Sequence, residues 1–491
     1  MTLGPWNPGL ETPIPEELRP LETVFREENV STRMAAAREL RGLTGLDPAN
    51  LVAFRPRRLM LHELLIRVTS NISVPSGEHI GDLGINFRRI TRTLLASEIE
   101  TRMDEVTRAY AAVKDALAKG AAKQVQRIFE ARDAHAIVAQ WDKEPTALHR
   151  ALSRIVSAIL VRHGKLWGPR EVIAALATDL ACNDAAGDAI GALIDPWVLE
   201  GAKREGYRIL PPQSRPVVMN TKGPSASGKS SLRHLQRRLA AEIGVDWDDF
   251  SLVSPDIWRK QLLEYESLGE NSRYAGPFTG EELRVVDVKL DRYMAAKAER
   301  GAMSHLLIDR FRFDSFAPQS EEAGSNLLTR FGHTVYLFFM ITPPDMLVER
   351  AWQRGLEFGR YKAVEDTLAH GVEAYAGMPQ LFFTWVRRTD KRVHFEFLDN
   401  SVALGQRPRT VAFGWNDAIY ILDEKSLLDV ERFRRVNIKA RSPAQLWPDA
   451  SILADANNTA FLRSCTSSFA KVVYDKAAIP AAERKHTLGD W

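Results

Sequence analysis

The stretch 223–230, with the sequence GPSASGKS, limits the possible folds of this 491-residue chain more than any other feature. It matches the phosphate-binding loop pattern G-x-x-x-x-G-K-[ST] at every fixed position. In such a loop, backbone N–H groups and the lysine surround nucleotide phosphates, and the hydroxyl after the lysine binds Mg²⁺. The sequence therefore predicts a nucleotide site that takes ATP or GTP with Mg²⁺.

The residues on both sides of this loop have the pattern that the motif requires. An apolar run over 216–220 is typical of a buried strand, and leucines at 232, 235 and 239 follow at helical spacing. Strand, loop and helix in this order favour a true phosphate loop over an ordinary Gly/Ser turn. The residues expected to bind nucleotide are Gly223, Pro224, Ser225, Ala226, Ser227, Gly228, Lys229, Ser230 and Ser231, with Ser230 as the metal ligand.

Four further apolar runs follow the loop and alternate with helical patterns. They cover 250–253, 305–308, 334–341 and 393–398. Together with the run before the loop, they predict an α/β fold: a P-loop kinase-type, mostly parallel five-stranded sheet with helices on both faces. Residues 412–422 have the pattern of a further strand or hairpin arm.

The part of the chain before the loop has a different character. Helical spacing dominates from residue 31 to about 180, and the stretch 206–216, with Pro211 and Pro212, indicates a linker. We predict an all-α N-terminal domain of unknown role over 1–210, a kinase-like domain over 211–435 and a C-terminal extension over 436–491.

Composition limits the setting and the partners. The two cysteines, Cys182 and Cys465, are too few for a disulfide framework, which fits a reducing cytoplasm. The N-terminus lacks the pattern of a secretory signal, and the most apolar run, 335–341, is too short to span a membrane. We expect a cytoplasmic protein without a membrane partner; export by a specialised secretion system stays open. The net charge of +3 is too small to indicate nucleic-acid binding by itself.

Two acidic residues follow predicted strands, at the sheet edge where ligands bind. Asp256 comes just after the 250–253 strand and is a candidate base for an acceptor hydroxyl, with Arg259 one turn later to hold an anionic acceptor. The alternative is that Asp256 only caps the helix that follows. Asp309 ends the third strand and is expected to position substrate or to bind Mg²⁺ through water, with Arg312 nearby to face the acceptor.

Positive charge for the transferring phosphoryl group is offered by the segment 349–362. It contains Arg350 and Arg354 on one helical face, and Arg360 after Gly359. Arginine suits this role because its planar guanidinium grips two phosphate oxygens. The alternative is a solvated helix face.

This ordered series resembles the zeta toxin family of bacterial P-loop kinases over residues 214–430. The matching features are the loop, Asp256 with Arg259, the strand ending at Asp309, the run GHTVYLFFMITP over 332–343, and the pairs Glu349-Arg350 and Gly359-Arg360. The sequence departs from the family pattern at Asp309, which is commonly Glu, and at Phe311, where a small polar residue is expected.

The resemblance implies transfer of the γ-phosphoryl group of ATP or GTP to a hydroxyl of a small nucleotide-type acceptor, UDP-N-acetylglucosamine-like or NAD-like. It implies Asp256 as the base, Lys229 and Ser230 at the phosphates and metal, Asp309 at the acceptor, and Arg360 with Arg350 or Arg354 at the transferring phosphate. Toxins of this family are held by a helical antitoxin, so residues 1–210 could be a fused inhibitor or the inhibitor could be separate; an unrelated substrate or targeting domain is an equal alternative for this region. Two alternatives remain open: a polynucleotide kinase, and a nucleotide-gated regulatory or scaffold ATPase whose helical half binds a partner.

Overall fold

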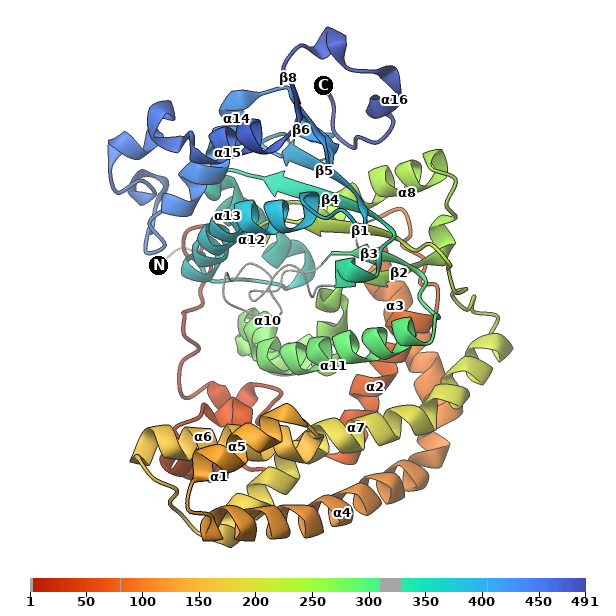
Figure 1. The fold of residues 1–491 in the computed structure, drawn as a ribbon, viewed down its shortest axis with the longest axis vertical. Helices are drawn as coiled ribbons and strands as arrows, with labels where there is room; N and C mark the ends of the chain where they lie inside the picture. The colour runs from red at the N-terminus through yellow and green to blue at the C-terminus, as the bar shows by residue number, and fades with distance from the viewer. Residues whose placement is uncertain (1–2, 80, 310–327, 404) are drawn as a thin grey trace.

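A mostly parallel sheet of eight strands runs through the second half of the chain (Figure 1). The computed structural model describes residues 3–79, 81–309, 328–403 and 405–491, and the fold class is α/β, as predicted. The strand order is β2-β3-β1-β4-β5-β6-β7-β8. The strands are β1 Val217–Lys222, β2 Phe250–Val253, β3 His305–Ile308, β4 Thr334–Ile341, β5 Arg392–Asp399, β6 Arg409–Trp415, β7 Ala418–Ile421 and β8 Lys471–Val473.

All five predicted strands are present, but the predicted number of strands is wrong. Strands β2, β3, β1, β4 and β5 are parallel to one another, whereas β5–β6 and β6–β7 are antiparallel and β7–β8 is parallel. The expected arm over 412–422 is the hairpin β6–β7, which turns at Asn416 and Asp417. Strand β8 has only three residues, so it carries too little periodicity to be recognised.

The parallel strands are covered on both faces. Every residue of β2 and β3 is buried, and β1, β4 and β5 are buried except at their first residue. This explains their continuous apolar runs, which are typical of strands that contact packed side chains on both sides.

The helices of the second half connect these strands. Helix α12 begins at Pro344, as its position after β4 predicts, because proline lacks only an N–H that is unpaired in a first turn. The helices are α8 Arg233–Glu242, α9 Arg259–Leu262, α10 Ala275–Phe278, α11 Gly280–Glu299, α12 Pro344–Phe358, α13 Val364–Val386, α14 Glu424–Arg432, α15 Ala460–Ser468 and α16 Ala481–Arg484.

The N-terminal region is helical, as predicted. Before β1, the described residues form helices and only isolated β-bridges. Helices α4 and α7 pack side by side at the end of the molecule farthest from the sheet (Figure 1). The helices are α1 Met34–Thr44, α2 Pro56–Asn71, α3 Asp82–Leu94, α4 Met103–Glu130, α5 Ala134–Lys143, α6 Ala147–His163 and α7 Arg170–Arg204, with a π-helical turn at Leu95–Ile99.

One hydrophobic cluster connects the helical region to the sheet. It contains Leu64 of α2, Leu306 of β3 and Phe461 of α15, so it crosses both predicted domain boundaries. The boundaries at 210/211 and 435/436 therefore stay predictions about sequence units, and the three units share one core. No helix within the described ranges is long and apolar enough to cross a membrane.

The order of the strands fixes where a ligand can bind. The chain passes from β1 to β2 and β3 on one side of β1, and then crosses to β4 on its other side. In open α/β sheets, ligands bind at the carboxyl ends of the strands, where the strand order reverses in this way. The segment after β1 is the phosphate loop, so the fold puts it at this point.

Candidate active site

The phosphate loop has a backbone that is suited to bind an anion. Ala226 has φ +66°, the one positive value at a non-glycine position among the described residues, and Gly228 has φ +91°. The backbone N–H groups of Ser225, Ala226 and Gly228 have no acceptor in the described parts of the chain. Successive unpaired N–H groups around left-handed residues form a concave anion site. These residues therefore fit a chain of phosphates.

Both glycines of the motif are required by space. A Cβ atom at Gly223 would lie 2.8 Å from Cβ of Met340, and a Cβ atom at Gly228 would lie 2.3 Å from Nδ2 of Asn400. No side chain fits at either position, because real Cβ contacts are not this short.

Two polar side chains outside the loop hydrogen-bond to its backbone. Asn400 Nδ2 donates to Ser227 O at 2.8 Å, and Thr342 Oγ1 donates to the same carbonyl at 3.3 Å. Tyr375 fixes Thr342 in turn, since its hydroxyl accepts from Thr342 N at 2.8 Å and donates to Thr342 O at 2.9 Å. Sequence analysis missed these residues. The available signal was the position of Thr342 and Asn400 directly after β4 and β5.

Lys229 and Ser231 donate hydrogen bonds to backbone carbonyls of the loop itself. Lys229 Nζ donates to the carbonyls of Gly223 at 3.1 Å and Pro224 at 2.7 Å. Burial lowers the pKa of the Lys229 ammonium, although the carboxylates of Asp309 and Asp256 act in the opposite direction. Ser231 Oγ bonds to Gly228 O at 2.6 Å, so its hydroxyl closes the end of the loop.

Asp309 joins the phosphate loop to the end of β3. Its Oδ2 accepts from Ser230 Oγ at 2.8 Å and from Arg233 Nη2 at 3.2 Å. Within the described residues, no group of three or more His, Cys, Asp or Glu side chains could hold a metal ion. Mg²⁺ at nucleotide sites usually has only one or two protein ligands besides phosphate oxygens and waters. The oxygens of Ser230 and Asp309 fit that donor set.

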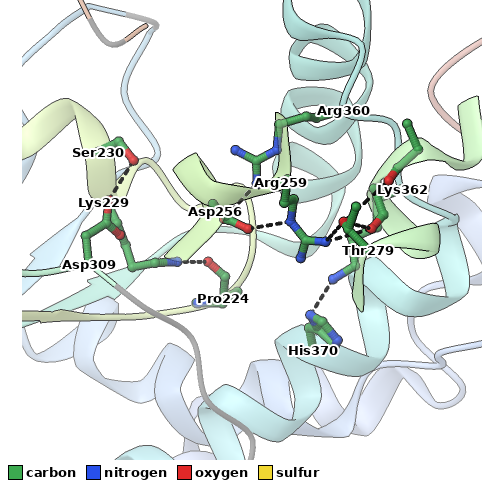
Figure 2. A network of polar contacts seen from close by, with 12 residues as sticks. Pro224, Lys229, Ser230, Asp256, Arg259, Thr279, Asp309, Arg360, Lys362 and His370 are labelled. Carbon is green, nitrogen blue, oxygen red and sulfur yellow. Dashed lines mark hydrogen bonds and ion pairs between the residues drawn. The ribbon is translucent and has the colours of Figure 1, made fainter. Parts of the chain in front are cut away.

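Asp256 is held by two arginines and is not a helix cap. Its Oδ1 accepts from Arg259 Nε at 2.9 Å, and its Oδ2 pairs with Arg360 Nη2 at 2.7 Å (Figure 2). Within the described part of the chain, no backbone N–H is bonded to this carboxylate and Ser254 is the residue at the helix N-cap, so the capping alternative is wrong. Burial would raise the pKa of Asp256, but the charges of Arg360, Arg259 and Arg354 outweigh burial and hold it well below its ordinary value.

Arg259 connects Asp256 to the start of α11. Its Nη1 donates to Gly276 O at 2.6 Å and to Thr279 Oγ1 at 2.7 Å. Figure 2 shows Asp256 between the phosphate-loop side chains and this arginine. The side chain of Asp256 is 47% exposed, so the carboxylate is accessible from solvent.

Arg354 belongs to this group, whereas Arg350 does not. Burial and the charge of Arg360 lower the pKa of Arg354 to about 10, and its guanidinium has no hydrogen-bond partner among the described residues. Arg350 instead donates to Asn400 O and Val402 O, both at 2.9 Å. The structure therefore connects Arg350 to the loop through Asn400 and not to the charged cluster. Arg312 lies outside the described residues.

Three further side chains next to this cluster were missed from the sequence. Lys362 contacts Nδ1 of His370, and burial lowers the pKa of both groups. The hydroxyl of Tyr265 is buried without a hydrogen-bond partner in the described ranges, near Arg259 and Arg360. Lys362 was detectable from its place two residues after Arg360, but Tyr265 and His370 carry no sequence signal.

The chain was compared with known proteins in three ways. Protein-family models, curated proteins and solved structures gave no significant match.

Proposed function

We propose that this chain is a kinase that transfers the γ-phosphoryl group of ATP or GTP to a hydroxyl of a small nucleotide-type acceptor. The observation that carries the proposal is the meeting of two groups at one sheet edge: Lys229 and Ser230 with Asp309, and Asp256 with two arginines. Phosphoryl transfer needs these parts, because its transition state requires positioning and charge more than covalent chemistry.

The phosphate loop binds the donor in this proposal. The backbone N–H groups of Ser225, Ala226 and Gly228 donate hydrogen bonds to the phosphate oxygens, and Lys229 turns from the loop carbonyls toward the outer phosphate oxygens. Ser230 and Asp309 would hold Mg²⁺, which supplies charge neutralisation between the β- and γ-phosphates.

Asp256 receives the proton of the acceptor hydroxyl. The acceptor oxygen forms a bond to Pγ, the bond from Pγ to the β,γ-bridging oxygen breaks, and the proton passes to Asp256 and then to water. A carboxylate of low pKa suits this role, because in a loose transition state the acceptor's proton leaves late. Arg354 and Arg360 face the moving phosphoryl group, and Arg259 holds the acceptor.

The acceptor class comes from the resemblance to zeta toxins, as UDP-N-acetylglucosamine-like or NAD-like. The proposal that Arg312 and Asp309 contact the acceptor also rests on this resemblance. A toxic activity would appear as growth arrest on expression in bacteria, and it would be absent in Asp256→Asn.

The test is transfer of labelled γ-phosphate from Mg-ATP and Mg-GTP to a panel of acceptors. The panel holds UDP-N-acetylglucosamine, NAD, nucleosides, and DNA and RNA with 5′-hydroxyl ends. We expect label on one small acceptor with wild type, no label with Asp256→Asn, and wild-type transfer with the control Asp248→Asn, which changes an exposed acid nearby. Nucleotide affinity should persist in Asp256→Asn and fall in Lys229→Ala.

Other outcomes would replace the proposal. Label on the nucleic acids alone would indicate a polynucleotide kinase. Release of free phosphate at one slow rate in wild type and Asp256→Asn, with no labelled acceptor, would indicate a nucleotide-gated scaffold and would remove Asp256 from the mechanism.

A further inference from the structure

Helix α2 of the N-terminal region is buried on all sides, although it carries several charges. Thirteen of its 16 residues are buried, including Arg58, His62, Glu63 and Arg67. It packs between α7 and α11, and it also contacts β2 (Figure 1). Buried charges are costly unless they are paired. The partners of these side chains therefore show which elements of the fold are bonded to α2.

Arg58 connects two elements of the candidate active site. Its guanidinium forms a two-point ion pair with the fully buried Glu282 of α11, and the Nη2–Oε2 distance is 2.6 Å. The same Nη2 donates to Leu262 O, at the end of α9, at 2.6 Å. His62 Nε2 also contacts Glu282 Oε1 at 2.6 Å. One side chain of the helical region thus fixes the end of α9 relative to the start of α11.

Those two elements are also joined through the site itself. Arg259, the first residue of α9, bonds to Asp256 on one side, and on the other to Gly276 O in α10 and to Thr279 Oγ1 directly before α11. The contacts form a closed ring: Asp256 to Arg259, then to the start of α11, then through Glu282 to Arg58, and back to α9 at Leu262. These contacts connect Arg58 to Arg259 and Asp256.

A second residue of α2 holds the same segment. Thr69 Oγ1 accepts from Trp258 Nε1 at 3.2 Å, and Thr69 O accepts from Ser251 Oγ at 2.8 Å. Trp258 is buried and lies two residues after Asp256. The start of β2 and the turn with Asp256 are therefore both hydrogen-bonded to α2.

The first residues of the chain cover the other side of this segment. Ile14, Leu18 and Leu21 pack on a small cluster, and Thr23 N donates to Phe278 O at 2.9 Å. The cluster consists of Leu263, Leu268, Ala275 and Phe278. The segment 255–279 thus lies between two parts of the N-terminal region.

We propose that residues 3–71 complete the acceptor side of the active site, and that Arg58 is the positioning residue for Asp256 and Arg259. The helical region is then a permanent part of the kinase and not a detachable inhibitor. This inference rests on the proposed function for its effect on transfer, but the positioning itself can be measured without activity.

The test uses the full-length variants Arg58→Met, Arg58→Lys and Thr69→Val. The matched control is Arg57→Met, because Arg57 is the neighbouring arginine, is 68% exposed and, among the residues that the structure describes, forms its ion pair with Glu100 alone. The readouts are thermal unfolding, nucleotide affinity, kcat and KM for the acceptor, and hydrogen exchange of 255–279 compared with the phosphate loop.

We expect Arg58→Lys to stay folded, because lysine keeps the charge opposite Glu282. It cannot reach both Glu282 and Leu262 O, so kcat should fall by about 100-fold, the effect of a shift of about 1 Å in a catalytic group. Nucleotide affinity should stay within a factor of about three of wild type, and exchange should increase in 255–279 and not in 223–231. Thr69→Val should show the same pattern more weakly, and Arg57→Met should match wild type.

The inference is overturned if Arg58→Lys and Thr69→Val keep wild-type exchange in 255–279 and wild-type kcat. It is also overturned if transfer and nucleotide affinity fall together in step with unfolding, since that pattern indicates a general loss of stability. If wild type transfers no phosphoryl group to any acceptor, the proposed function fails, and the exchange data still decide whether Arg58 positions the segment.

Discussion

Arg360 Nη2 lies 2.7 Å from Asp256 Oδ2, and this ion pair joins the connection between α12 and α13 to the segment after β2. The two residues come from different layers of the fold, and each has a separate role in the proposed reaction. In the proposed reaction, this contact lets the arginine that stabilises the phosphoryl charge also orient the proposed base. Loss of either residue should therefore affect the chemical step more than nucleotide binding.

Replacement of Arg360 by Gln should lower kcat for phosphoryl transfer by about 10³-fold, the scale of arginines that contact a transferring phosphoryl group. Nucleotide affinity should change little, because Lys229 and the loop N–H groups bind the phosphates. Steady-state kinetics with a nucleotide titration checks this, and Glu357→Gln, an exposed change on α12, is the control. A variant that loses affinity but keeps kcat would assign Arg360 to donor binding.

Arg354 and Arg350 should behave differently, although they lie one turn apart on α12. Arg354→Met removes an unpartnered guanidinium next to Arg360, so we expect a 10²- to 10³-fold loss of kcat, roughly the effect of removing one preorganised charge, with no loss of stability. Arg350→Met removes two bonds to carbonyls and should lower the free energy of unfolding by about 2 kcal/mol. Chemical denaturation and kinetics on both proteins test this; equal losses of kcat would contradict it.

The variant Ala226→Gly should be slightly more stable than wild type. The left-handed backbone at Ala226 costs a non-glycine residue about 1–2 kcal/mol, and glycine removes this cost. Glycine also raises the conformational entropy of the unfolded chain, which lowers stability by about 0.4–1 kcal/mol. We expect the free energy of unfolding to rise by up to about 1 kcal/mol in urea denaturation. Ala302→Gly, in a turn without positive φ, should be neutral or destabilised. A less stable Ala226→Gly would mean that the loop has a different backbone in solution.

Glu396 should make stability depend on pH. Burial raises the pKa of this carboxyl to about 7, although bonds from Thr410 Oγ1 and the N–H groups of Leu488 and Gly489 act in the opposite direction. The folded state then binds more protons than the unfolded state between about pH 4.3 and 7, so the free energy of unfolding falls as pH rises through this range.

Thermal unfolding between pH 5 and 8 measures this effect. We expect the decrease in stability with rising pH to be mostly absent in Glu396→Gln, because the amide does not titrate. The decrease should persist in Glu200→Gln, which changes an exposed acid on α7. An identical pH dependence in Glu396→Gln and wild type would show that Glu396 is ionised throughout.

Much of the sheet could be predicted because buried parallel strands appear in the sequence as runs of mostly apolar residues. The runs that became β1 to β5 are mostly apolar, although β5 also carries His394 and Glu396, and helical patterns lie between the successive runs. The later strands could not be counted from the sequence. Asn416 and Asp417 divide one predicted arm into two strands, and Lys471–Val473 is too short for a pattern.

The residues of the candidate site that belong to a local sequence motif could be predicted. The residues that only tertiary contacts bring together could not. The residues 223–231 follow from one pattern, and Asp256 and Asp309 follow from strand ends. Helical spacing puts Arg350 and Arg354 on one face, and only the packing of α12 against the end of β5 separates their roles. Nothing in the sequence connects Arg58 to Asp256, because that connection exists only after α2 and α11 have packed.

The ion pair between Arg58 and Glu282 also has a consequence for synthesis on the ribosome. The two residues are 224 positions apart, so at about 5–20 residues per second the ribosome needs roughly 10–45 s to reach the second after making the first. During that time Arg58 and His62 have no buried carboxylate to pair with, and the nascent helical half cannot adopt its final core. We therefore expect a chain that stops at residue 210 to bind chaperones or aggregate, and the folding of its N-terminal half to wait for α11.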